Sequence, residues 1–156
     1  MDEHEKHEKF LNVNIEKWIY GTIDKVQERD WEWKEAWRET YFKIGGLKES
    51  IANKGCPRKG AEALYELGRI KNTNIEYQNK TLQYVNDNLS KNGVYSLLAL
   101  RILSESEGKS QIELSDLWDN VKRCYLEALG EKPANSNNGA TTVAYKLWNL
   151  GMIKDN

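Results

Sequence analysis

The chain has 156 residues, of which 39% are hydrophobic and 30% charged, and it includes six Trp and eight Tyr. This length and apolar content allow one domain that folds without disulfides or metals, which excludes a disordered chain. The formal net charge of −1 lacks the basic excess that a dedicated nucleic-acid-binding domain usually shows, although residues 51–104 carry a net +4.

The N-terminal segment is polar. Residues 1–9 contain no basic region followed by an apolar one, and no apolar run approaches the about 18 residues of a membrane span. We expect these nine residues to fray. His4 and His7 stand among carboxylates, but a structural metal site usually needs four ligands, so no metal or other cofactor is predicted. Cys56 and Cys124 are far apart, which favours reduced thiols in the cytoplasm.

Helical periodicity dominates residues 10–44. An apolar stripe predicts a helix over residues 10–26, and Asp30 is suited to cap the next helix. In that second helix the aromatic residues recur every four positions, and Gly45-Gly46 ends it; they are Trp33, Trp37 and Tyr41. We therefore expect an N-terminal helical hairpin.

The middle of the chain, residues 47–104, is expected to contain three further helices after a short helix or turn over 47–54. The first begins near Pro57 and ends before Gly68, the second is capped by Thr73 or Asn74, and the third is apolar on most of its circumference. Asn92-Gly93 is predicted to separate the last two. Residues 94–104 are thus the expected central core helix.

Two helices are predicted in residues 110–154. The first opens with a capping box at Ser110–Glu113 and ends at Gly130, and the second covers residues 140–150. The sequence as a whole predicts an all-α fold, a compact single-domain bundle of about seven or eight helices over residues 10–154.

One short sequence occurs twice. Residues 63–72 and 146–155 share the order Leu, aromatic, polar, Leu, Gly, any residue, Ile, Lys. Each copy is typical of a helix that ends at a glycine with positive φ, followed by a buried isoleucine. Such endings are common in helix-turn-helix modules and also close many other helices, so we expect two helix-turn-helix-like units, within 47–104 and 110–154.

If the helices of the repeat were recognition helices, their N-termini and outer faces would contact phosphates and base edges. The candidate nucleic-acid-binding residues are Arg58, Lys59, Asn138, Thr141, Thr142, Tyr145 and Lys146. A turn that closes the core explains the repeated Leu, Gly and Ile without any ligand.

Three tryptophans lie close together, and Trp33 and Trp37 share a helix face that Trp31 cannot join. We expect Trp33 and Trp37 in the core. Trp31 is the candidate for a protein interface, since exposed aromatic residues are favoured there.

Cys56 is the weak candidate for a catalytic residue. It stands at a predicted helix N-terminus beside cationic residues, surroundings that activate a thiol, but no base is marked nearby. A structural thiol is the simpler interpretation. Glu62 and Glu66, one turn apart, are expected on a solvated face.

Residues 54–61, Lys-Gly-Cys-Pro-Arg-Lys-Gly-Ala, and the ending Leu147-Trp148-Asn149-Leu150-Gly151-Met152-Ile153 resemble a family of small uncharacterised microbial proteins, a domain of unknown function. The resemblance covers most of residues 30–153. The segment from Thr73 to Lys91 is longer here. The resemblance implies a shared helical fold and contributes no catalytic residue.

These observations predict a non-enzymatic helical binding module that engages a protein or a nucleic acid. The alternative is a thiol-dependent enzyme or redox-sensitive protein that uses Cys56.

Overall fold

Small residues allow three helices to meet at the centre of the protein. The computed structural model describes residues 3–106, 112–135 and 139–154. Helices α5 (Gly55–Glu66), α7 (Lys91–Glu105) and α9 (Gly139–Asn149) pack against one another. A Cβ on Gly60 would lie 2.5 Å from the Cβ of Ala140, so only glycine permits this approach of α5 to α9. The run from Gly93 to Leu100 is buried, which confirms the central position of α7.

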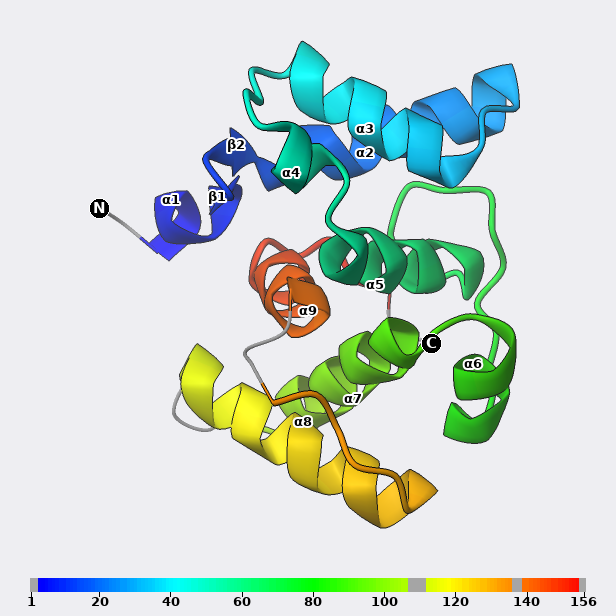
Figure 1. Cartoon of the computed structure of the whole chain (residues 1–156), viewed down its shortest axis with the longest axis vertical. Coiled ribbons are helices and arrows are strands. Elements are labelled where there is room, and N and C mark those ends of the chain that lie inside the picture. Colours follow the sequence, from blue (N-terminus) through cyan, green and yellow to red (C-terminus); the bar gives the residue numbers. More distant parts are fainter. Residues whose placement is uncertain (1–2, 107–111, 136–138, 155–156) are drawn as a thin grey trace.

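The tryptophan-rich hairpin covers one side of this centre. Helices α2 (Ile15–Arg29) and α3 (Trp33–Lys43) lie above α5 and α9 in Figure 1, and α8 (Leu114–Leu129) lies with α7 on the opposite side. Trp18 stacks on Trp37 with ring centroids 4.3 Å apart. Trp33 stacks on Tyr65 of α5 at 5.2 Å, which joins the hairpin to the centre. The predicted core positions of Trp33 and Trp37 are confirmed.

The remaining elements are short. They are α1 (Glu3–Glu8), β1 (Lys9–Phe10), β2 (Val13–Asn14), α4 (Glu49–Ala52) and α6 (Leu82–Asn88). The all-α class is confirmed, and α1 adds one helix to those expected. No helix in the described ranges combines the length and apolar character needed to cross a bilayer.

The two copies of the repeat end in the same way and then meet. Gly68 has φ +70° and Gly151 has φ +73°, and each closes its helix with a Schellman pair of hydrogen bonds. Ile70 then pairs with Ile153 in an isolated antiparallel bridge, which we call the exit bridge. In a helix-turn-helix unit the chain would enter a second helix directly after the glycine. Here the chain after Gly68 and after Gly151 continues into the exit bridge instead.

Two expected helix boundaries in the middle of the chain are wrong. Residues 71–81 form a loop without helix that begins with a bend at 71–74, where Asn72 has φ 64°. The Thr73 hydroxyl donates to Ile70 O and accepts from Ile75 N in this bend, so it caps no helix. Thr81 caps the short α6 instead. The Asn92-Gly93 pair does not interrupt the chain either, because Ser90 caps α7 two residues earlier.

The structure of the N-terminal region also differs from the prediction. Leu11 and Asn12 both have positive φ and form the turn of the β1–β2 hairpin, where the first helix was expected to begin. Asp30 has φ 55° and ends α2 instead of capping α3. Residues 3–8, expected to fray, form α1, in which His7 is buried. The predicted cap Ser110 lies outside the described residues, and Glu113 occupies the N-cap of α8.

The two repeat glycines provide a matched test of how the 71–81 loop packs over Gly68. An alanine at Gly151 would meet nothing within 4 Å, so Gly151→Ala should cost only the left-handed backbone conformation, about 1–2 kcal/mol of unfolding free energy. At Gly68 the new Cβ would also overlap the backbone oxygen of Glu76. Gly68→Ala should therefore lose clearly more stability in urea denaturation. Equal losses would show that the loop over Gly68 is not packed as described.

Candidate anion-binding site

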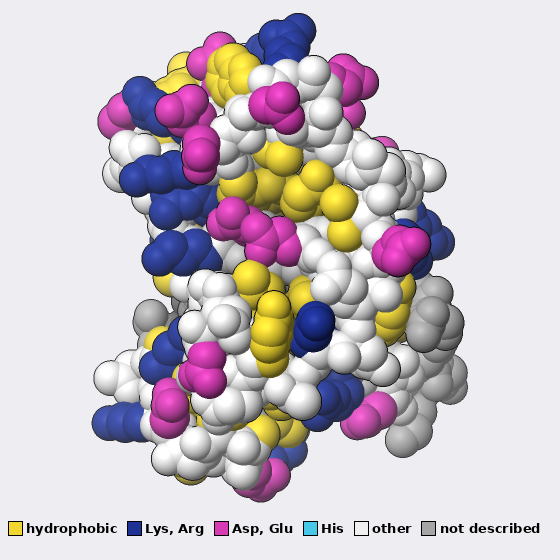
Figure 2. All heavy atoms as spheres, turned by 90° about the vertical axis from the view of Figure 1, so that its right-hand side faces the viewer, with side chains coloured by type: hydrophobic (Ala, Val, Ile, Leu, Met, Phe, Trp, Pro, Cys, Tyr) yellow, Lys and Arg dark blue, Asp and Glu magenta, His cyan; other side chains and the backbone are white. Residues whose placement is uncertain are grey.

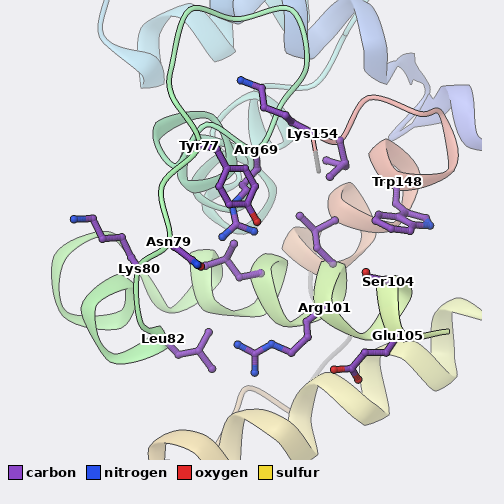
Figure 3. A pocket seen from close by; sticks show the side chains of 13 residues that line it. Arg69, Tyr77, Asn79, Lys80, Leu82, Arg101, Ser104, Glu105, Trp148 and Lys154 are labelled. Carbon is purple, nitrogen blue, oxygen red and sulfur yellow. The ribbon is translucent and has the colours of Figure 1, made fainter. Parts of the chain in front are cut away.

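A basic pocket lies where the 71–81 loop crosses α7 (Figure 3). Its volume is about 310 Å³. The wall is built from the turn after α5, the loop, the outer side of α7 and the chain end after α9. We call this cavity the Arg69 pocket; its lining residues are Arg69, Tyr77, Asn79, Lys80, Leu82, Leu97, Leu100, Arg101, Ser104, Glu105, Trp148, Ile153 and Lys154.

Arg69 supplies the central cation. Its guanidinium lies 4.2 Å from the centroid of the Tyr77 ring, and Nη2 donates to the Gln78 carbonyl at 3.3 Å. The Nε atom is buried and has no hydrogen-bond partner. Burial lowers the pKa of Arg69, and the like charge of Arg101 acts in the same direction. Within the described residues no carboxylate pairs with this guanidinium, so part of its donor capacity is unused.

The other charged side chains of the lining differ in whether they are bonded to the protein, directed away from the cavity or exposed. Lys154 Nζ donates to the Ile75 carbonyl at 3.1 Å and so ties down the loop. Lys80 lies over the Tyr84 ring, and Figure 3 shows its amine directed away from the cavity. Arg101 is exposed on α7, and Glu105 is the one acidic residue of the lining. The lining thus contains two guanidinium groups and only one carboxylate, and a guanidinium suits a bound carboxylate or phosphate.

The residues predicted to bind nucleic acid do not form one exposed basic face. Thr141 and Tyr145 are buried, because α9 packs against both α5 and α7, so their expected placement on an outer face is wrong. Lys146 is half-buried and Nζ donates to the Lys6 carbonyl at 3.2 Å. Burial lowers the pKa of Lys146, with Lys6 a second cause. Thr142 is half-buried, and Asn138 lies outside the described residues.

Arg58 and Lys59 lie in the first turns of α5. Arg58 Nη1 donates to the Asn53 carbonyl at 3.4 Å, and both cations act on the carboxylate of Glu62. Lys59 is exposed and Arg58 is half-buried. Nucleic-acid contact by these residues stays a prediction.

Cys56 and Trp31 are both half-buried. Cys56 is the second residue of α5, and no hydrogen bond from a base reaches it among the contacts of the described residues. Trp31 lies between α2 and α3, with its backbone N–H bonded to Lys25 O at 3.2 Å. Their roles as nucleophile and protein interface stay predictions. Nor do three His, Cys, Asp or Glu side chains gather as possible metal ligands in the part of the chain that is described.

Sequence reasoning missed Arg69, Tyr77 and Arg101. Arg69 occupies the variable position of the repeat, where the second copy has Met152. Comparing the two copies selects the residues that they share, so it passes over Arg69. The net positive charge of residues 51–104 was the one available signal. That charge could not show which cations share a cavity, because the loop path brings Tyr77 to Arg69.

The model of a family of unknown function, DUF6979, matches residues 20–154. No curated protein and no solved structure matches the chain.

Glu62 lines a hollow of about 180 Å³ between α5 and α6, where burial raises the pKa of its carboxyl and Glu66 adds to the effect. A carboxyl with a raised pKa binds its proton more tightly in the folded state, so its ionisation lowers stability as pH rises. Glu62→Gln should therefore raise the unfolding free energy at neutral pH, by less than about 1 kcal/mol because the group is partly solvated.

This gain should vanish near pH 3, where both folded and unfolded carboxyls are protonated. Urea denaturation at the two pH values checks it, with the exposed Glu127→Gln as control. A gain for Glu62→Gln that does not depend on pH would contradict this explanation.

Proposed function

This chain belongs to the DUF6979 family, whose function is unknown, and we propose that it is a non-enzymatic binding module that holds a small anionic ligand in the Arg69 pocket. The ligand class is a phosphate or carboxylate attached to a small organic group. The expected cytoplasmic location is part of this proposal.

The incompletely paired guanidinium of Arg69 is the observation that carries the proposal. Taking a cation out of water is costly unless hydrogen-bond acceptors replace the water, and Arg69 has one carbonyl partner and a buried Nε without any. A phosphate or carboxylate offers two acceptor oxygens in the geometry that a guanidinium binds best. Such a ligand would complete the set of partners that the protein leaves open.

The size and walls of the cavity favour a small molecule. Its volume of about 310 Å³ lies at the lower end of the range for small-molecule sites. Tyr77 and Trp148 place aromatic rings in the lining, while Ser104 and Asn79 add a hydroxyl and an amide. These groups suit a ligand with a flat or apolar part beside its anionic group.

The charge distribution argues against an extended nucleic-acid track on this side of the molecule. Figure 2 shows acidic side chains interspersed with lysine and arginine on the face that carries the loop and α6. A backbone-tracking surface would be more uniformly positive. The partial exposure of Trp31 still allows a protein partner as a second proposal, independent of the pocket.

Isothermal titration with inorganic phosphate and AMP tests the proposed site. The protein should bind AMP more tightly than phosphate, and higher salt should weaken both. Arg69→Met should lose about tenfold or more in affinity, the equivalent of a charged hydrogen bond, and Arg69→Lys should retain part of the binding.

The matched control is Arg123→Met on the exposed side of α8, which should leave affinity unchanged. If neither probe binds, or if a folded Arg69→Met variant binds as the wild type does, the proposed function is wrong. Binding of duplex DNA without binding of either probe would favour the nucleic-acid prediction instead.

A further inference from the structure

A second cavity, the groove between α2 and α3, contains a buried lysine. The groove has a volume of about 570 Å³, and Lys25 reaches it with only 9% of its surface exposed. Lys25 Nζ donates to Thr40 Oγ1 at 3.0 Å. A Cβ on Gly21 would lie 2.6 Å from Thr40 Cγ2, so the glycine lets the two helices approach and keeps the Thr40 hydroxyl beside the amine.

The surroundings of Lys25 lower the pKa of its amine and so make the neutral form easier to reach than in a solvated lysine. Its hydrogen-bond partner is a hydroxyl, and within the described residues no carboxylate forms an ion pair with it. Burial lowers the pKa of Lys25, and Lys43 of α3 and Arg29 of α2 act in the same direction. Glu39 of α3 and Asp24 of α2 oppose them without reversing the shift. A desolvated lysine next to another cation is the arrangement that activates an amine as a nucleophile.

We infer that Lys25 is a nucleophilic amine that binds a small carbonyl acid covalently and reversibly, as an imine, in the groove between α2 and α3. The lone pair of Nζ attacks the carbonyl carbon, forming the C–N bond while the C=O π bond opens to a carbinolamine. Both protons of the neutral amine pass to the former carbonyl oxygen, which leaves as water and gives the neutral imine; a proton from solvent then converts it to the protonated imine. Nothing is oxidised or reduced in this condensation.

The groove also indicates the class of carbonyl compound. Its lining holds four cationic side chains, those of Lys17, Lys25, Arg29 and Lys43, against the two carboxylates of Asp24 and Glu28. The ammonium groups of Lys17 and Lys43 can pair with a carboxylate on the ligand. Thr40 is a positioning residue, since its oxygen fixes the direction of the amine. A small aldehyde or keto acid meets both requirements. This site is separate from the Arg69 pocket, so either proposal can fail alone.

Reductive trapping tests the inference on the full chain. Limiting glyoxylate with cyanoborohydride at neutral pH converts each imine to a stable secondary amine, and peptide mass mapping locates it. Lys25 should carry most of the label in singly modified protein. Lys25→Arg should lose that label, and Lys34→Arg, at an exposed lysine outside the groove, should leave the label on Lys25.

Lys43→Gln gives a second readout on an exposed residue that should not affect folding. Removing this cation should raise the pKa of Lys25, so the labelling of Lys25 should fall at neutral pH and recover at higher pH. Label spread over exposed lysines, with Lys25 no more modified than Lys17 in the wild type, would overturn the inference. An unchanged pH profile in Lys43→Gln would overturn it as well.

Discussion

The structure depends on the exit bridge, the antiparallel pairing of Ile70 with Ile153. Helices α5 and α9 already touch at their beginnings, where Gly139 lies against Pro57 and Gly60 against Ala140. The bridge joins the chain where it leaves both helices, so α5 and α9 are held at both ends. The flanking residues make the backbone hydrogen bonds of the bridge, Lys71 N to Met152 O and Lys154 N to Arg69 O. The two isoleucines bury apolar surface there, and α7 packs against both α5 and α9.

The same pairing builds the Arg69 pocket. Lys154 N donates to Arg69 O at 2.7 Å, which fixes the backbone from which the guanidinium projects. The loop that supplies Tyr77 is held separately, by Gln78 N to Leu67 O at 2.9 Å and by the Lys154 side chain on Ile75 O. Irregular chain segments thus form the walls of the pocket that face α7, and each of them is tied to the helical centre. A site held in this way can present its cation in one position without rearrangement.

Periodicity and end signals were enough to predict the long helices. The aromatic spacing placed Trp33 and Trp37 in the core, and the repeat identified Gly68 and Gly151 as helix ends. The pairing of these two helix ends with each other is a tertiary contact. Sequence similarity between two segments does not show whether they lie side by side. Thr73 illustrates a local ambiguity, because the hydroxyl that suits a helix cap serves equally well in a turn.

The candidate site was less accessible to sequence reasoning than the fold. The prediction that Thr141 and Tyr145 lie on an outer face assumes that their helix packs on one side only and exposes the other side to solvent. Helix α9 is instead surrounded by α1, α5, α7 and α8, which leaves little of its circumference exposed. Arg69 could not be selected because its importance comes from a cavity that a distant loop completes.

The topology of the exit bridge also bears on how the chain reaches its native state. Its two strands of a single residue each are separated along the chain by α6, α7, α8 and α9. A pairing so distant in sequence contributes a high contact order, and its loop-closure entropy is compensated only once the intervening helices are docked. Folding should therefore run from local hairpins, such as α2 with α3, towards a late step that closes the molecule around α7.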